Sequence, residues 1–310
     1  MPAKRAKRDL LSIADLGKDL LPIIKRARRL KAERRRGLMR PTLRHKNVSM
    51  IFEKPSTRTR TSFEVGLNDL GAHALYMSPK DMQLGRGETI ADTARALSRF
   101  VDAIVYRAFR HQDEAELAEW ASIPVINALD DREHPCQIVS DLFTLSERWK
   151  TYAGHRIAWV GDGNNVCHSL ILGCAMVGLD LSSATPDGYH PDPTIVSEAQ
   201  TLAQTSGAEL DFFTEPAAAV KGADAVYTDV WVSMGEEAEQ TAREKAFAGF
   251  QVNPTLLAQA NPGAFVMHDL PAHRGLEITD DVIDGPHSIV WDQAENRLHA
   301  QKAILEVLIG

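Results

Sequence analysis

The sequence predicts an α/β protein of two domains, each a parallel sheet flanked by helices. Its 310 residues fit two domains of about 150 residues each. In both halves short apolar runs alternate with helical patterns, which is typical of βαβ units. A polar stretch at 150–154 separates the two series, so we place the domains at 1–149 and 150–293. Two such domains would form a cleft between them, where small ligands usually bind.

The first domain is predicted from four apolar runs of strand length. Phe63, Leu67 and Leu70 fall on one face of a helix between two of these runs, and a further helix begins near His134. The four runs are Val48–Phe52, Ala74–Met77, Ala103–Tyr106 and Ile123–Asn127.

The second domain is predicted from five further runs. The first of them follows the polar stretch directly. The runs are Arg156–Gly161, Leu210–Phe213, Asp224–Trp231, Ala264–Leu270 and Ser288–Trp291. The final helical stretch, 294–308, could stay with this domain or pack back on the first.

Composition excludes several classes of protein. With 44% hydrophobic and 25% charged residues, the chain is neither collagen-like nor wholly disordered. No run approaches the roughly 20 apolar residues that span a bilayer. Three cysteines do not make a disulfide framework, which favours a reducing cytoplasm. The N-terminus lacks the apolar region of a secretory signal.

Charge is distributed unevenly along the chain. The net charge is -7, yet residues 1–46 hold 16 Lys and Arg against 4 Asp and Glu. Between Lys25 and Arg36 the cations are interleaved with Ala27 and Leu30 near a helical period, which favours the solvated face of an ordinary helix. The alternative is an interaction arm or an anion-attracting rim.

The segment Glu53–Phe63, EKPSTRTRTSF, predicts a phosphate site. A strand ends before it, and Ser56 occupies the position of a helix N-cap. The first turn of a helix offers unpaired N–H groups and the positive end of its dipole. Arg58 and Arg60 add forked donors for oxyanions. The alternative is a capped helix with two surface arginines.

A second cluster, Glu133–Gln137, also lies between a strand and a helix. His134 stands at a rigid helix start before Pro135, and Gln137 lies nearly on the same face. Together they could bind a polarised carbonyl and its amide nitrogen; the alternative is a His cap beside a polar Gln. Arg107 follows a predicted strand at its carboxyl end, where open α/β sheets bind ligands.

In the second half, Gly161–Ser169 begins with Gly-x-Gly after a strand. This hints at a dinucleotide site, but Val166 stands where that motif has its third glycine, so the indication is weak. Asn164 and Asn165 are better placed to hold a carboxylate.

Two sharp turns follow strands further along. One carries Asp229 and the loop Ser233–Gly235, and the other is His268–Pro271. Both are consistent with a shared ligand cleft. We find no His, Cys, Asp and Glu set with metal-ligand spacing.

Seven motifs in register resemble those of the ornithine carbamoyltransferases, in the aspartate/ornithine transcarbamoylase family. The motif HPCQ fits any transcarbamoylase, as does STRTR, whereas the SMG loop points to ornithine. The motifs are STRTR at Ser56–Arg60, QLGRGE at Gln83–Glu88, YR at Tyr106–Arg107, HPCQ at His134–Gln137, DVWVSMGEE at Asp229–Glu237, HDLPAHRG at His268–Gly275 and ENRLHAQKA at Glu295–Ala303.

The resemblance implies an enzyme that carries out one reaction in the cleft. Carbamoyl phosphate and L-ornithine would give citrulline and phosphate, with no cofactor and no metal. The chain would form a homotrimer with active sites at its interfaces, because Gln83 would reach carbamoyl phosphate in a neighbouring subunit. No nucleic acid or membrane partner is implied, and the biosynthetic and catabolic directions both stay open.

Site residues follow from the same resemblance. The catalytic residues would be Arg107, His134 and Asp269. The ornithine-binding residues would be Asn165, Asp229, Ser233 and Met234. The carbamoyl phosphate-binding residues would be Ser56, Thr57, Arg58, Thr59, Gln83, Arg107, His134, Gln137, Leu270 and Arg297.

Asp269 departs from the family, which has Cys at this position. The thiol normally lies beside the side-chain amine of ornithine, so the change touches the reacting end of the substrate. Asp269 could accept a proton, orient the amine, or hold it as ammonium. It could also mark another amine substrate such as putrescine or an acylated ornithine, or a weakened paralogue that binds carbamoyl phosphate without turnover.

Overall fold

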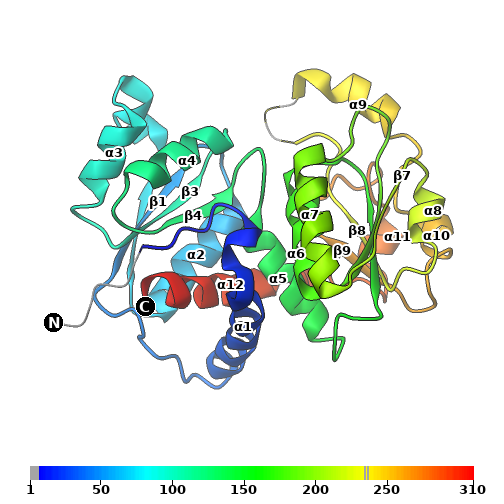
Figure 1. Cartoon of the computed structure of the whole chain (residues 1–310), viewed down its shortest axis with the longest axis horizontal. Coiled ribbons are helices and arrows are strands. Elements are labelled where there is room, and N and C mark those ends of the chain that lie inside the picture. Colours follow the sequence, from blue (N-terminus) through cyan, green and yellow to red (C-terminus); the bar gives the residue numbers. More distant parts are fainter. Residues whose placement is uncertain (1–6, 234, 236) are drawn as a thin grey trace. The chain divides into compact units, whose positions relative to one another are not determined.

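The chain divides into two compact units in a computed structural model that describes residues 7–233, 235 and 237–310 (Figure 1). The first unit runs to Phe143 and also takes up Asn296–Gly310, while the second is Thr144–Glu295. Each unit is built on a parallel sheet flanked by helices, as the sequence predicts.

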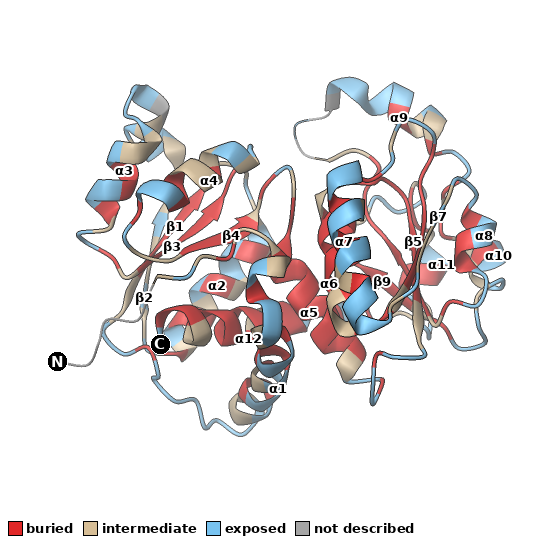
Figure 2. Cartoon of the chain, viewed as in Figure 1, coloured by how far each residue is buried: buried red, intermediate tan, exposed pale blue. Residues whose placement is uncertain are grey.

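The first unit contains a four-stranded sheet in the order β2-β1-β3-β4. All three strand pairs are parallel, so the carboxyl ends of the strands meet at one edge. Figure 2 shows β1, β3 and β4 largely buried, whereas β2 at the margin of the sheet is partly exposed. The strands are β1 (Asn47–Phe52), β2 (His73–Met77), β3 (Ala103–Arg107) and β4 (Val125–Leu129).

Helices cover this sheet. Most of α12 belongs to this unit, where Lys31 Nζ on α1 donates to Asn296 Oδ1 at 2.7 Å and Lys302 Nζ donates to Asp69 Oδ2 on α2 at 2.9 Å. The α-helices are α1 (Leu20–Arg35), α2 (Thr57–Asp69), α3 (Ile90–Leu97), α4 (His111–Trp120), α5 (Pro135–Ser146) and α12 (Val290–Ile309), and the 3-10 helices are η1 (Ile13–Asp19), η2 (Pro79–Asp81) and η3 (Leu84–Arg86).

The basic segment near the N-terminus forms α1. Ile23, Ala27 and Leu30 are buried on one face, whereas Lys25 and Arg29 are exposed on the other. This confirms the interpretation as an ordinary helix with a solvated basic face.

The second unit contains a five-stranded parallel sheet in the order β7-β6-β5-β8-β9. Neighbouring β5 and β8 are out of sequence order, so the connections reverse direction between them. In open α/β sheets the crevice at such a reversal is where ligands bind. The strands are β5 (Arg156–Val160), β6 (Asp180–Ala184), β7 (Leu210–Phe213), β8 (Ala225–Thr228) and β9 (Phe265–His268).

Helices cover both faces of this sheet as well. The α-helices are α6 (Asn165–Val177), α7 (Pro193–Ser206), α8 (Pro216–Val220), α9 (Gln240–Ala246), α10 (Pro254–Leu257) and α11 (Asp280–Ile283), with the 3-10 helix η4 (Glu237–Glu239). No helix in the described part of the chain is long and apolar enough to cross a membrane.

Two elements of the second unit differ from the sequence prediction. The strand β6 was not predicted. The run Ser288–Trp291, predicted as a strand, makes only a single bridge, Ser288 to Val266, before α12 begins at Val290. Trp291 is 60% exposed, because it lies on the outer side of the first turn of α12.

Candidate functional site

The first turn of α2 has the features of an anion site. Ser56 is its N-cap, in extended backbone conformation, and the Ser56 Oγ accepts the N–H of Thr59 at 3.2 Å. No acidic residue occupies the first turn. Arg58 is half-buried and Thr57 is exposed, so a cation and a hydroxyl accompany the helix N-terminus.

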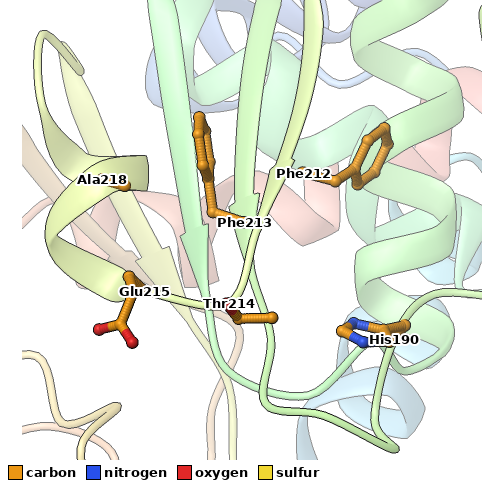
Figure 3. Close-up of a pocket in the computed structure, with 6 residues that line it drawn as sticks. All are labelled: His190, Phe212, Phe213, Thr214, Glu215 and Ala218. Carbon is orange, nitrogen blue, oxygen red and sulfur yellow. The ribbon is translucent and has the colours of Figure 1, made fainter.

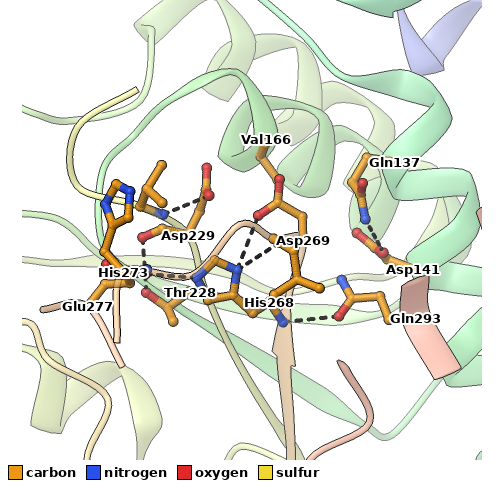
Figure 4. Close-up of polar contacts among 12 residues, drawn as sticks. Gln137, Asp141, Val166, Thr228, Asp229, His268, Asp269, His273, Glu277 and Gln293 are labelled. Carbon is orange, nitrogen blue, oxygen red and sulfur yellow. Dashed lines mark hydrogen bonds and ion pairs between the residues drawn. The ribbon is translucent and has the colours of Figure 1, made fainter. Parts of the chain in front are cut away.

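Arg297, from α12, joins two of the predicted residues. Its Nη2 donates to Thr59 Oγ1 at 2.9 Å, and its Nη1 donates to Gln137 Oε1. The Gln137 amide donates in turn to Asp141 Oδ1 at 2.9 Å (Figure 4). Arg297 thus uses one lone pair of the Gln137 oxygen, and the second lone pair and the second amide hydrogen can meet a ligand.

Arg107 and His134 complete this group. Arg107 ends β3 and lies opposite Leu129 across a shift in register between β3 and β4. His134 is 2% exposed. Burial lowers the pKa of His134 well below its ordinary value, and the charges of Arg297 and Arg107 lower it further. A neutral imidazole beside two guanidinium groups can donate to a carbonyl oxygen that gains negative charge.

Gln83 belongs to a different segment of the first unit. It is exposed at the start of η3, after β2.

In the second unit, Asp229 follows β8 and is buried. Its Oδ2 accepts from Asn164 Nδ2 at 2.8 Å, and its Oδ1 accepts the N–H of Val230 at 2.7 Å. Asn164 is also the N-cap of α6. Asn165, one residue on, is half-buried and accepts the N–H of Val166 at 3.0 Å.

The loop after Asp229 is described only in part. Ser233 is half-buried. Met234, predicted to bind ornithine, lies outside the described residues.

A second turn at the same sheet edge carries His268 and Asp269 (Figure 4). Nδ1 of His268 accepts the N–H of Leu270 at 2.9 Å, and Nε2 lies 3.1 Å from Glu277 Oε1. His268 therefore carries its proton on Nε2 and donates it to Glu277. Asp269 Oδ1 lies 3.6 Å from His268 Nδ1. Leu270 has a positive φ of 61° and precedes a cis peptide bond to Pro271.

Asp229, His268 and Asp269 also form a set with the geometry of metal ligands, which the sequence analysis missed. One ligand atom from each lies within 4.8 Å of the others. The fold brings the set together from two strand ends, so short spacing could not reveal it. Both ring nitrogens of His268 are already engaged by Leu270 and Glu277, so coordination would require His268 to give up one of these contacts.

The glycine turn after β5 serves chain packing. A Cβ on Gly163 would lie 2.3 Å from the Pro191 nitrogen, and the Gly163 N–H donates to Tyr189 O at 2.9 Å. The neighbouring segment therefore occupies the space that a pyrophosphate would need, which argues against a dinucleotide site.

Two hollows open on the second unit. One, of about 470 Å³, lies at the carboxyl end of β7 and is lined by His190, Phe212, Phe213, Thr214, Glu215 and Ala218 (Figure 3). The other, of about 410 Å³, lies beside α10. No predicted site residue lines either one.

Known proteins match the chain over nearly its full length. An ornithine carbamoyltransferase from Methanoculleus marisnigri is 54% identical and covers 98% of this chain and 97% of its own. A catabolic ornithine carbamoyltransferase from Thermoplasma volcanium is 51% identical, covering 98% and 99%. The structure of ornithine carbamoyltransferase from Pyrococcus furiosus has a TM-score of 0.95 at 51% identity, covering 98% of both chains.

Family models agree with these relatives. The carbamoyl-P binding domain of aspartate/ornithine carbamoyltransferase matches residues 8–147. The Asp/Orn binding domain of the same enzymes matches residues 153–308. With a matching domain in each half and relatives above 50% identity, the chain belongs to the aspartate/ornithine carbamoyltransferase family.

Proposed function

We propose that the chain is an ornithine carbamoyltransferase, which transfers the carbamoyl group of carbamoyl phosphate to the side-chain amine of L-ornithine. The products are L-citrulline and phosphate. The observation that carries the proposal is the cluster of Thr59, Arg107, His134 and Arg297, which combines donors for an oxyanion with the N-terminus of α2. A relative similar in sequence and a solved structure similar in fold are both named ornithine carbamoyltransferase.

The phosphate end of carbamoyl phosphate binds at the start of α2 in this proposal. Its oxygens take N–H groups of the first turn together with Ser56, Thr57, Arg58 and Thr59. Gln83 of a neighbouring subunit adds a donor. Leaving phosphate then departs toward a helix dipole and cations, which stabilise its growing charge.

The carbamoyl carbonyl is polarised by Thr59, Arg107 and His134. As the amine attacks, this oxygen becomes an oxyanion, and donors already in place stabilise it without reorganisation. Gln137 takes the carbamoyl amide, and Leu270 and Arg297 line the carbamoyl phosphate side. Positioning and oxyanion stabilisation supply the rate enhancement, with no covalent intermediate.

Ornithine binds to the second unit. Asn165, Asp229, Ser233 and Met234 hold its α-carboxylate and α-ammonium. Asp269 lies beside the reacting amine, at a turn shared with His268. These α-group contacts favour ornithine over putrescine, which has neither group.

Assembly and location complete the proposal. The enzyme is a cytoplasmic homotrimer in which Gln83 is given to the site of the next subunit, and its partners are its two small substrates. Relatives are named both anabolic and catabolic, and the chain acts in arginine biosynthesis or in the reverse direction.

A colorimetric citrulline assay on purified protein tests the function. We expect phosphate release and citrulline formation that depend on both carbamoyl phosphate and L-ornithine. Putrescine and N-acetylornithine, supplied in its place at equal concentration, should give less than one tenth of that rate. A higher rate with either would assign another amine, and binding of carbamoyl phosphate with no turnover would indicate a weakened paralogue.

A further inference from the structure

The backbone just before His134 is held in an unusual conformation. Leu129, the last residue of β4, has a φ of 147°, which a branched side chain rarely adopts. The shift in register between β3 and β4 occurs at the same place and sets Arg107 opposite Leu129. Such a conformation persists only where neighbouring contacts determine it.

Asp130 provides these contacts. Its side chain is fully buried, and both of its oxygens accept hydrogen bonds. Asn127, which donates to Asp130, also accepts the N–H of Leu129 at 2.8 Å. Four donors converge on the Asp130 carboxylate: the backbone N–H groups of Arg132 at 2.8 Å and Glu133 at 2.6 Å, Asn127 Nδ2 at 3.0 Å and His111 Nδ1 at 2.6 Å.

Glu114, on α4, lies in the electrostatic surroundings of this carboxylate. It is fully buried, and no basic side chain among the described residues pairs with it. Burial raises its pKa well above the ordinary value, and Asp130 raises it further. The carboxyl group of Glu114 therefore ionises less readily than an exposed glutamate.

His111 is a second titratable group beside Asp130. Its hydrogen bond to Asp130 raises the pKa of its imidazole. Other titratable or charged groups near Glu114, His111 or Asp130 are Asp9, Glu53, Tyr106, Asp131, Arg132, Glu133 and Cys136.

We propose that Asp130, held by His111, Asn127 and the backbone N–H groups of Arg132 and Glu133 beside the buried Glu114, is the positioning residue that sets the Leu129–His134 turn and so aims His134 at the carbamoyl group. This rests on the proposed function. The carboxylate fixes both the entrance of the turn, through Asn127, and its end, through the N–H of Glu133 beside His134. Asp130 touches no substrate in this scheme.

The first test compares Asp130→Asn with Asp131→Asn. Asp131 is exposed in the same turn and accepts only the His111 N–H among the contacts described for it, at 2.6 Å. In Asp130→Asn an amide N–H would face the donors of His111 and Asn127, so the turn should shift. We expect kcat for citrulline formation to fall at least tenfold while the Kd for inorganic phosphate changes less than twofold. Asp131→Asn should change neither.

The second test uses Glu114→Gln, whose amide can donate to Asp130 but does not titrate. A carboxyl group with a raised pKa is neutral below that pKa and ionises above it. Ionisation of Glu114 would add a second negative charge near Asp130, so the kcat of the wild type should fall at alkaline pH. In Glu114→Gln this loss should move to higher pH by at least one unit. Superimposable kcat profiles up to pH 10 would overturn the role of Glu114.

A third readout is independent of turnover. We expect NMR titration of the His134 imidazole to give a pKa well below its ordinary value in the wild type and in Asp131→Asn, and a pKa shifted back toward the ordinary value in Asp130→Asn. If the wild type makes no citrulline, the proposed function fails, and this titration still decides the positioning role. Equal His134 titrations in the two Asn variants would refute it. If Asp130→Asn does not fold, the Glu114→Gln profile decides.

Discussion

The neutral imidazole of His134 limits what the first unit can do with a carbonyl group. Burial and the charges of Arg297 and Arg107 keep the ring uncharged at neutral pH. An uncharged ring donates one N–H without adding a third positive charge to the two guanidinium groups. In the proposed reaction, positive charge beside the developing oxyanion would therefore come from these two arginines and not from the imidazole.

Replacement of Arg58 tests the phosphate assignment. Arg58→Ala should remove a charge-assisted contact worth about 1.5–3 kcal/mol, so the Kd for carbamoyl phosphate should rise more than tenfold. Arg60→Ala is a matched control, because Arg60 is exposed, lies 3.5 Å from the centre of the Tyr76 ring and pairs with Glu64. Calorimetric titration of both variants measures the difference. Equal affinities would exclude Arg58 from the phosphate site.

Asp269 places a second carboxylate near Asp229. The direction in which its replacement should shift the pH profile can be predicted. A carboxylate beside the amine stabilises the ammonium, which cannot attack, at a cost of about 1.36 kcal/mol per unit of raised amine pKa. In Asp269→Cys the rising limb of the plot of log(kcat/KM) for ornithine against pH should therefore move to lower pH. Activity at pH 7 should rise. Asp269→Asn, which removes the charge alone, should move the limb in the same direction.

Two other outcomes have defined meanings. An unmoved limb in both variants would show that Asp269 is not beside the amine. Loss of citrulline formation in both would give Asp269 a positive role in catalysis, such as accepting a proton.

At the scale of elements, β6 shows why a buried strand escaped prediction. Ser182 and Ser183 occupy fully buried positions in Asp180–Ala184, so the run is not apolar. Ser182 Oγ donates to the carbonyl oxygen of Ala219 at 2.6 Å, which removes the penalty for burying it. A search for apolar runs cannot detect a strand whose polar groups are satisfied by a partner far away in the sequence.

The helix α12 carries a buried histidine that makes stability depend on pH. Burial, together with the positive charges of Lys302, Lys31 and Arg34, lowers the pKa of His299 to about 3. The unfolded chain takes up this proton near pH 6.5, whereas the folded protein resists until about 3. The free energy of unfolding should therefore fall as pH decreases from 6.5, by up to about 1.4 kcal/mol per pH unit for this group.

His299→Gln should flatten this dependence. Urea unfolding at pH 7, 6, 5 and 4 measures it, with His73→Gln at an exposed position as control. If His299→Gln loses stability with falling pH as steeply as the wild type, the imidazole is not held neutral by its surroundings.

At the scale of the whole molecule, the proposed trimer requires each active site to combine two chains. Mixing an Arg58→Ala chain with a Gln83→Ala chain should then restore part of the activity, because some interfaces would join two wild-type contributions. The mixture is assayed after joint refolding, beside each variant refolded alone. Full activity of wild-type protein that sediments as a monomer would refute the shared site.

The sequence predicted the class of fold and the separate motifs, but not how they meet. The helix cap at Ser56 could be predicted because local spacing determines it. The bond from Arg297 to Thr59 could not, since it joins residues from opposite ends of the chain. The grouping of Asp130, Glu114 and His111 could not be predicted, because residues of these types usually lie at the surface and only the fold buries them.

The return of residues 296–310 to the first unit has a consequence for synthesis on the ribosome. The whole second unit is translated before this segment emerges. Until then, Lys31 of the first unit lacks its contact with Asn296, and Thr59 and Gln137 lack their contacts with Arg297. A nascent chain stalled before residue 296 would contain all nine described strands but no Arg297. Under the proposed function, carbamoyl phosphate would thus meet the linked Arg297, Thr59 and Gln137 only after residue 297 has emerged from the ribosome.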